Sequence, residues 1–297
     1  MSTFFGFLKL IRWSNLLTIF IAQFTFIFCV FPTNQNNDFT SLLNFILLAS
    51  STILIAAGGY IINDVFDIEC DKINKPNKVF IPTPIKSKTA KIYYVIFSLT
   101  GLIFGTILSF RISIPNAAYL FIGIIILLYA YSKKLQKLPF IGNFLISVLV
   151  ASNTLILLLL IETNTENSYE TILLFQFSFF AFFINLIREI IKDIQDINGD
   201  YNVGMHTLPI LLGKKRTKKI IYIISIVPIY FMIRFCLDKL HSKLFFQIIY
   251  TLLILVPLSY FYFSLFHATK KKQFQFLSTL LKGILILGLL FLLIITY

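Results

Sequence analysis

The sequence has little charge, few acidic residues and few of the residues that build disulfides or zinc sites. Charged residues make up only 13% of the 297 residues, with one tryptophan and three histidines. The three cysteines, Cys29, Cys70 and Cys236, are scattered, which excludes a disulfide framework and the close spacing of cysteine-based zinc sites. The histidines have no motif around them, so a Ser-His-Asp or Cys-His hydrolase has no support.

What the sequence has in abundance is apolar residues. They make up 58% of the chain, and the mean hydropathy is +0.86, well above what a water-soluble domain needs. Runs of about 17 to 23 mostly apolar residues can cross the hydrocarbon core of a bilayer. Because no Gly/Ser-rich linker interrupts these runs, we expect one domain over residues 1–297. The runs predict an all-α polytopic membrane protein with nine spans, roughly at 16–32, 42–62, 92–110, 117–131, 140–161, 172–191, 220–237, 245–267 and 277–296.

The positive charge follows this topology. A net charge of +13 would suggest a nucleic-acid partner in a soluble chain. Most lysines and arginines, however, fall in the N-terminal segment and the even-numbered loops. The positive-inside rule predicts that these parts lie on the cytoplasmic side, and we expect the membrane to be the cell (inner) membrane. No unexplained basic patch is left for nucleic acid. Lys282, a basic residue inside the last predicted span, is interpreted as snorkelling to an interface.

The first residues predict an interfacial helix. Between Phe4 and Trp13, Lys9 and Arg12 stand among Phe and Leu residues, a pattern typical of helices that lie in the membrane surface. A cleaved signal peptide is the alternative, but the apolar run is long and no small-residue cleavage site follows it. We therefore expect a retained first span, with Arg12 at its mouth either facing an acceptor or serving topology.

Acidic residues are rare but concentrated in two windows. Eight of the thirteen lie at or just after the ends of the second and sixth spans: Asp64, Asp67, Glu69 and Asp71, then Glu189, Asp193, Asp196 and Asp200. In each window three aspartates are spaced +3 and then +4. If a window continues its span as a helix of 3.6 residues per turn, these positions lie within about 60° of one another. Three carboxylates would then share one helix face.

Such carboxylates favour a bound cation. They would repel one another where low polarity already disfavours charge. Oxygen ligands without nearby His or Cys suit Mg²⁺ or Mn²⁺, and Mg²⁺ commonly completes its shell with substrate phosphate oxygens. Two facing clusters with Lys and Arg close by therefore predict a metal-bridged diphosphate. Solvated loops in which aspartates cap helices and pair with lysines are the alternative, and the repeated spacing weighs against them.

The polar windows adjoin long apolar helices rich in Phe and Tyr. A substrate with a diphosphate head and an isoprenoid tail would find both ends accommodated. Ionising an allylic diphosphate leaves a carbocation and pyrophosphate, which aromatic faces and cations can stabilise. A divalent-cation transporter is the rival from another class, but transporter sites lie near the bilayer midplane, and no Asp or Glu falls centrally in a predicted span.

The two windows resemble the aspartate motifs of the UbiA superfamily of intramembrane prenyltransferases. The first runs Asn63-Asp64-Val-Phe-Asp67-Ile-Glu-Cys-Asp71, and the second runs Arg188-Glu189-Ile-Ile-Lys192-Asp193-Ile-Gln-Asp196-Ile-Asn-Gly199-Asp200. Between them, Tyr129-x-x-x-Lys133 followed by Gly142-Asn143 is similar to a further stretch of that family. The resemblance covers essentially the whole chain and implies the nine-span architecture.

The resemblance implies Mg²⁺-dependent transfer of a polyprenyl group from its diphosphate to a lipophilic or aromatic acceptor. The six motif aspartates would be the catalytic metal ligands. Five further residues would contact the diphosphate or hold the motifs in place: Asn63, Tyr129, Lys133, Arg188 and Lys192. The chain departs from the family pattern after the first motif, where Lys78 replaces an arginine and so keeps the charge but loses the bidentate fork.

The second motif is most similar to the digeranylgeranylglyceryl phosphate synthase branch of the family. Members of that branch add a geranylgeranyl group to geranylgeranylglyceryl phosphate, which is therefore the favoured acceptor. Related motifs among quinone and tocopherol prenyltransferases keep an aromatic acceptor of quinone biosynthesis open.

Overall fold

The computed structural model describes residues 3–31, 39–76, 79–81, 85–160, 169–239 and 244–296. These residues contain no strand, and nine helical segments among them are long and apolar enough to cross a membrane. The all-α, nine-span prediction is confirmed, whereas the side that the N-terminus faces stays a prediction. Lys78 and the prolines that follow it lie outside the described residues. The nine segments are Trp13–Val30, Leu42–Phe66, Ser87–Arg111, Pro115–Lys133, Ile141–Leu159, Tyr169–Asn202, Leu208–Leu237, Leu244–His267 and Lys271–Thr296.

The chain divides into two compact units, and each is described by itself. The first comprises residues 1–136 and 153–167, and the second comprises residues 137–152 and 168–297. The expectation of a single domain stays a prediction. The helices of the first unit are α1 (Thr3–Leu10), α2 (Trp13–Phe24), the π-helix η1 (Thr25–Val30), α3 (Phe39–Phe66), α4 (Ile68–Asn74), α5 (Ser87–Arg111), η4 (Pro115–Ala117), α6 (Ala118–Lys133) and η6 (Ile156–Leu159).

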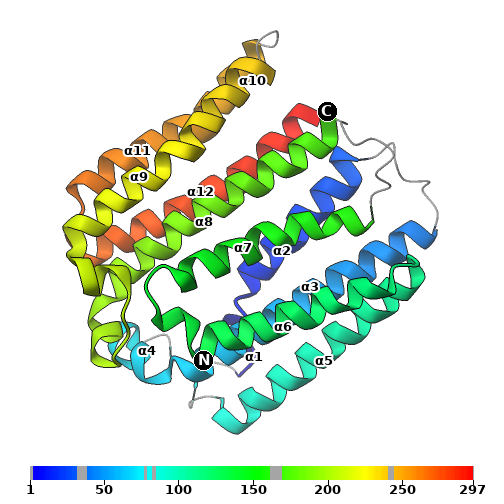
Figure 1. Ribbon diagram of the computed structural model, residues 1–297, viewed down its shortest axis with the longest axis horizontal. Coiled ribbons are helices and arrows are strands. Elements are labelled where there is room, and N and C mark those ends of the chain that lie inside the picture. Colours follow the sequence, from blue (N-terminus) through cyan, green and yellow to red (C-terminus); the bar gives the residue numbers. More distant parts are fainter. Residues whose placement is uncertain are drawn as a thin grey trace. The chain divides into compact units, whose positions relative to one another are not determined.

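Small residues bring α3 and α5 into close contact along their length (Figure 1). The Ser51 hydroxyl donates a 2.7 Å hydrogen bond to the Gly101 carbonyl. Deeper in the same unit, the fully buried Gln23 amide donates to the Asn153 side chain at 3.0 Å and to the Thr52 hydroxyl at 3.2 Å. Interfaces made of small residues and hydrogen bonds between helices hold helices together in lipid, because the hydrophobic effect does not drive helix association there.

A side chain at Gly101 is expected to destabilise the first unit. A Cβ there would lie 2.8 Å from Ile55 and 3.0 Å from the Ser51 carbonyl oxygen, so α3 and α5 would have to separate. We expect Gly101→Leu to lower stability by roughly 1–3 kcal/mol, the usual cost of overpacking, measured as thermal unfolding in detergent. Gly123→Leu on α6 is the matched control, because a Cβ at Gly123 meets nothing within 4 Å. Equal melting temperatures for the two variants would contradict this account.

The second unit is built around two long helices, α8 and α12, which run alongside each other (Figure 1). Their contact buries Ile187, Ile190 and Ile194 of α8 against a core that includes Leu277 and Leu281 of α12. The large apolar side chains on the outside of α9 and α11 stay exposed, as expected for surfaces that face lipid. The helices are η5 (Leu135–Lys137, at the boundary), α7 (Ile141–Leu155, its last residues in the first unit), α8 (Tyr169–Asn202), α9 (Leu208–Lys239), α10 (Leu244–Tyr250), the π-helix η7 (Thr251–Leu255), α11 (Val256–His267) and α12 (Lys271–Thr296).

The helices reach further than the predicted spans. The sixth span was expected to end near residue 191, but α8 continues to Asn202 and carries the whole second aspartate window. Likewise α9 begins at Leu208, within the predicted loop, and breaks at Gly213, where φ is 78°. Hydropathy marks the part of a helix that lies in hydrocarbon, whereas charged residues continue the same helix at the membrane surface.

Candidate active site

The first aspartate window is split between two helices. Asp64 lies in the last turn of α3, Asp71 lies in α4, and Asp67 lies between them with φ −92° and ψ 5°. The expectation of one continuous helical face is therefore wrong for this window. Both halves keep their backbone connection, because the Asp67 N–H donates to the Asn63 carbonyl at 2.9 Å and the Asp71 N–H donates to the Asp67 carbonyl at 2.8 Å. The bend re-aims Asp71 relative to Asp64.

Asp64 is held by an arginine from the chain's beginning. Arg12 Nη2 lies 2.9 Å from Asp64 Oδ1, and the guanidinium stacks 4.9 Å from the centre of the Tyr60 ring. Arg12 occupies the junction of α1 and α2 in the left-handed region, with φ 52° and ψ 51°. A non-glycine residue in this region stores strain of the kind that accumulates at functional sites. The contact holds the Asp64 carboxylate beside the Arg12 guanidinium.

Loss of the Arg12 charge is expected to reduce turnover. Without its partner Asp64 is free to change rotamer, and removing a residue that orients a ligand-binding group typically costs about 10- to 100-fold in activity or metal affinity. We expect Arg12→Gln to fall in this range and Arg12→Lys to recover part of it, measured as the initial rate of prenyl transfer. Lys9→Gln removes the same charge from exposed α1 and is the control. A turnover unchanged in Arg12→Gln would refute the positioning role.

Asp67 accepts hydrogen bonds at both carboxylate oxygens. Asn63 Nδ2 donates to Oδ2, and Gln136 Nε2 donates to Oδ1 at 2.7 Å. Burial of the side chain and the negative charge of Asp71 raise the pKa of Asp67 to about 7 despite the Gln136 hydrogen bond. A nearby cation would favour the ionised carboxylate. Asn63 thus has a structural partner within its own motif, as the resemblance implied.

Tyr129 and Lys133 lie one turn apart at the end of α6. Lys133 Nζ sits 5.7 Å from the centre of the Tyr129 ring. The same ring makes an edge contact with Phe66, the last residue of α3, at 5.9 Å and stacks on Tyr94 at 6.3 Å. Phe66 and Tyr129 are 41% and 38% exposed, so their faces remain accessible beside Asp67. The first unit thus brings Tyr129 and Lys133 close to the first aspartate motif.

The second aspartate window is one uninterrupted helix, as the spacing predicts. Asp193, Asp196 and Asp200 lie in the last third of α8, where Asp196 and Asp200 are only 9% and 6% exposed. Positions spaced +3 and +4 on this helix share one face. The helix stops at Asn202 and is followed by Gly204 with φ 72°, a left-handed conformation that glycine adopts without strain.

A polar seam between α7 and α8 orients Asp193. Asn143 Nδ2 donates to Asp193 Oδ2 at 2.9 Å. The Asn143 carbonyl accepts from the Ser147 hydroxyl at 2.6 Å, and Ser147 in turn accepts from Asn185 at 3.3 Å. All three polar side chains of this seam are buried, so Asp193 has one defined orientation.

Arg188 and Lys192 meet at one carboxylate on the same helix. Arg188 Nη1 lies 3.0 Å from Glu189 Oε1, and Lys192 Nζ lies 2.8 and 2.9 Å from the two Glu189 oxygens. The side chains of Arg188, Glu189 and Lys192 are 18%, 12% and 30% exposed. Glu189, which the resemblance did not assign a role, therefore holds both cations at the end of the apolar part of α8.

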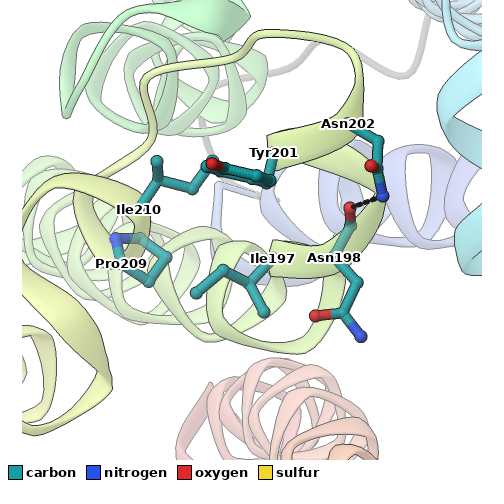
Figure 2. A pocket seen from close by; sticks show the side chains of 6 residues that line it. All are labelled: Ile197, Asn198, Tyr201, Asn202, Pro209 and Ile210. Carbon is teal, nitrogen blue, oxygen red and sulfur yellow. Dashed lines mark hydrogen bonds between the residues drawn. The ribbon is translucent and has the colours of Figure 1, made fainter.

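The loop after α8 forms a small open pocket of about 300 Å³ (Figure 2). Asn202 Nδ2 donates to the Asn198 carbonyl at 2.7 Å along its edge. The pocket contains no carboxylate and no cation, and its α8 residues point to a different helix face from the motif aspartates. It is therefore not the diphosphate site. The lining residues are Ile197, Asn198, Tyr201, Asn202, Pro209 and Ile210.

The carboxylates suit a magnesium ion that is shared with a substrate. Over the described ranges, no three His, Cys, Asp or Glu side chains are grouped closely enough to hold a metal ion alone. Mg²⁺ usually takes only one or two protein carboxylates, with waters and substrate phosphates completing the shell. The all-oxygen donors of both motifs fit that mode, and the hydrogen bonds to Asp64, Asp67 and Asp193 pre-orient them.

Three residues of the site escaped the sequence prediction. The sequence leaves two roles open for Arg12 and predicts no aspartate partner for Gln136 or Asn143. Each contacts an aspartate 50 or more positions away. The spacing of residues along the chain does not indicate such distant pairs. The only available sequence feature is that Gln136 and Asn143 are polar amide residues at the ends of spans.

The chain is similar to known proteins along most of its length. The family model described as "UbiA prenyltransferase family" matches residues 24–285. The chain belongs to the UbiA prenyltransferase family. It is accordingly a prenyltransferase and an integral membrane protein, and the cation-transporter alternative loses its support. The chain is 31% identical over 271 residues to a digeranylgeranylglyceryl phosphate synthase of Methanosphaera stadtmanae, covering 90% of this chain and 89% of the relative. It is 35% identical to the synthase of Methanococcus aeolicus over 70% of this chain and 68% of the relative.

Solved UbiA-family structures share the fold. A structure described as a digeranylgeranylglyceryl phosphate synthase in membranes superposes with a TM-score of 0.66 at 28% identity, covering 99% of this chain and 98% of that one. A UbiA homologue from Archaeoglobus fulgidus, solved with DMAPP and Mg²⁺, superposes with a TM-score of 0.57 at 17% identity, covering 97% and 99%. The second likeness shows the fold alone, and its ligands belong to that protein.

Proposed function

We propose that this prenyltransferase moves a geranylgeranyl group from its diphosphate to geranylgeranylglyceryl phosphate in a Mg²⁺-dependent reaction. The observation that carries the proposal is the likeness, over 90% of the chain, to a relative that bears the name digeranylgeranylglyceryl phosphate synthase. In the reaction the bond between C1 of the donor and the diphosphate oxygen breaks. The acceptor hydroxyl oxygen forms a new ether bond to C1 and releases its proton, and pyrophosphate leaves.

Six carboxylates would hold the leaving group through metal. Magnesium bound to them would supply electrostatic stabilisation of the departing diphosphate. Arg12, Gln136 and Asn143 support this role because they fix the orientation of Asp64, Asp67 and Asp193. Lys133, Arg188 and Lys192 would add positive charge toward the diphosphate, and Asn63 would hold Asp67. The proposed ligands are Asp64, Asp67, Asp71, Asp193, Asp196 and Asp200.

The aromatic pair beside the first motif suits the reacting end of the prenyl chain. Phe66 and Tyr129 present accessible ring faces next to Asp67. Positive charge that develops at C1 as the diphosphate leaves is attracted to such faces. We propose that Tyr129 faces this carbon and that the site opens on the cytoplasmic side of the membrane, which the distribution of basic residues among the loops favours.

The acceptor is tested with a panel. Purified protein in detergent would receive Mg²⁺, labelled geranylgeranyl diphosphate and one of three acceptors: geranylgeranylglyceryl phosphate, 4-hydroxybenzoate or dihydroxynaphthoate. Mass spectrometry of extracted lipids would identify the products. We expect a doubly alkylated glyceryl phosphate and no prenylated aromatic product. Prenylation of an aromatic acceptor without the lipid product would overturn the proposed acceptor and favour quinone biosynthesis.

A further inference from the structure

Tyr60 lies on α3, one helical turn before Asp64. Residues four apart on a helix are neighbours on its surface, so α3 presents a ring and a carboxylate side by side. The Arg12 guanidinium meets both: Nη2 lies 2.9 Å from Asp64 Oδ1, and the central carbon Cζ lies 4.9 Å from the centre of the Tyr60 ring. One cation from the start of the chain therefore contacts two positions of the same helix face.

The Tyr60 ring restricts how the guanidinium can move. Among the described residues, Arg12 is the one hydrogen-bond partner of the Asp64 side chain, and Tyr60 is the one aromatic partner of Arg12. A single hydrogen bond leaves a long arginine side chain free to rotate about it. An aromatic face attracts a guanidinium and gives it a second point of contact. The ring and the carboxylate together therefore fix an orientation that the hydrogen bond alone does not.

Tyr60 is also joined to the turn that carries Arg12. Asn15 Nδ2 donates to the Tyr60 hydroxyl oxygen at 3.4 Å. Asn15 and Arg12 belong to one turn at the start of α2, because the Asn15 N–H donates to the Arg12 carbonyl at 2.7 Å. This turn contains the left-handed backbone of Arg12, a conformation that only surrounding contacts maintain in a non-glycine residue. Tyr60 supplies two of those contacts, one through its ring face and one through its hydroxyl.

We infer that Tyr60 is a positioning residue of the reaction, which acts through Arg12 to hold Asp64 in the orientation that binds metal. The inference rests on the proposed function, in which Asp64 is a ligand of the Mg²⁺ that holds the diphosphate. Tyr60 is not itself a metal ligand. Without the ring, Arg12 keeps its charge but loses its fixed orientation, so the Asp64 carboxylate is free to change rotamer and binds the Mg²⁺-diphosphate less tightly.

Packing between the first span and α3 is the alternative role for Tyr60, and Phe45 supplies the matched control. Phe45 is 3% exposed on α3 and contacts Phe20 and Phe28 of the first span, with 5.9 and 5.0 Å between ring centres. It lies nineteen residues before Asp64, about 28 Å along the helix axis. Phe45→Leu therefore loosens the same pair of helices far from the aspartate motif.

Tyr60→Leu tests the positioning role, because leucine keeps apolar bulk and has no aromatic face. The affinity of the purified protein for inorganic pyrophosphate would be measured by calorimetry with and without Mg²⁺. We expect Mg²⁺-dependent binding that Tyr60→Leu weakens about tenfold and that Tyr60→Phe, which keeps the ring face, weakens less than about threefold. Phe45→Leu should lower the thermal unfolding temperature and leave the affinity unchanged. Tyr60→Met also lacks a ring and replaces Tyr60→Leu if that variant does not fold.

A double variant tests whether Arg12 transmits the effect. If Tyr60 acts through Arg12, Tyr60→Leu adds no further loss of affinity to Arg12→Gln, whereas independent effects would multiply. The inference is overturned if the wild type shows no Mg²⁺-dependent binding, if Tyr60→Leu keeps wild-type affinity, if Phe45→Leu loses as much, or if the losses multiply. A wild type that binds Mg²⁺ and pyrophosphate but does not prenylate geranylgeranylglyceryl phosphate would refute the proposed acceptor instead, so the two failures are distinguishable.

Discussion

Asp196→Asn and Asp64→Asn are each expected to reduce prenyl transfer roughly 100- to 1,000-fold, the size of effect seen when a group that stabilises transition-state charge is lost. Asparagine keeps the shape and one oxygen of the side chain but carries no charge, so its attraction to a divalent cation is lost. Asp196 is nearly buried on α8, and Asp64 is oriented by Arg12. The measurement is the initial rate of label transfer from geranylgeranyl diphosphate.

Two control variants distinguish the loss of a metal-binding carboxylate from the loss of any carboxylate. Glu69→Gln removes an exposed carboxylate within the first window that contacts only Lys72 among the described side chains. Glu170→Gln removes an acid from the first turn of α8. Both should keep near wild-type rates, and all four variants should unfold at similar temperatures. Undiminished turnover in the two aspartate variants would remove the motifs from the reaction.

Chelating divalent cations is expected to abolish transfer, and adding Mg²⁺ back should restore it. The reason is that the proposed donors are oxygen atoms, which suit Mg²⁺ and Mn²⁺ better than metals that prefer sulfur or imidazole. The fold should survive chelation, because Asp64, Asp67 and Asp193 already have protein partners. Rates would be measured over a Mg²⁺ titration after treatment with EDTA.

The same titration extends to the variants. Asp64→Asn should need a higher Mg²⁺ concentration for half-maximal rate than the wild type, whereas Glu69→Gln should not. Full activity of the wild type in excess EDTA would show that its carboxylates act without a metal ion and would refute this part of the proposal.

The membrane architecture could be predicted from the sequence because it depends on composition over long windows. Twenty apolar residues must cross a bilayer as a helix, since the backbone has no other way to satisfy its hydrogen bonds. The same reasoning predicted that Asp193, Asp196 and Asp200 share a helix, and α8 bears this out. It failed at Asp67, where α3 ends and α4 begins, because a periodic spacing does not reveal where a helix bends.

The partners of the aspartates could not be predicted. The contacts of Arg12 with Asp64, Gln136 with Asp67 and Asn143 with Asp193 join distant parts of the chain. Nothing in the local pattern around either residue of such a pair indicates the other.

We propose that each aspartate motif contributes to the binding of a Mg²⁺-bound diphosphate. The most direct test of this claim is equilibrium binding of an unreactive thiolodiphosphate analogue of geranylgeranyl diphosphate to the purified protein, with and without Mg²⁺. We expect Mg²⁺-dependent binding by the wild type and at least about tenfold weaker binding by Asp64→Asn and by Asp196→Asn. Wild-type affinity in either variant would contradict the account, because that motif would then make no contribution to holding the diphosphate.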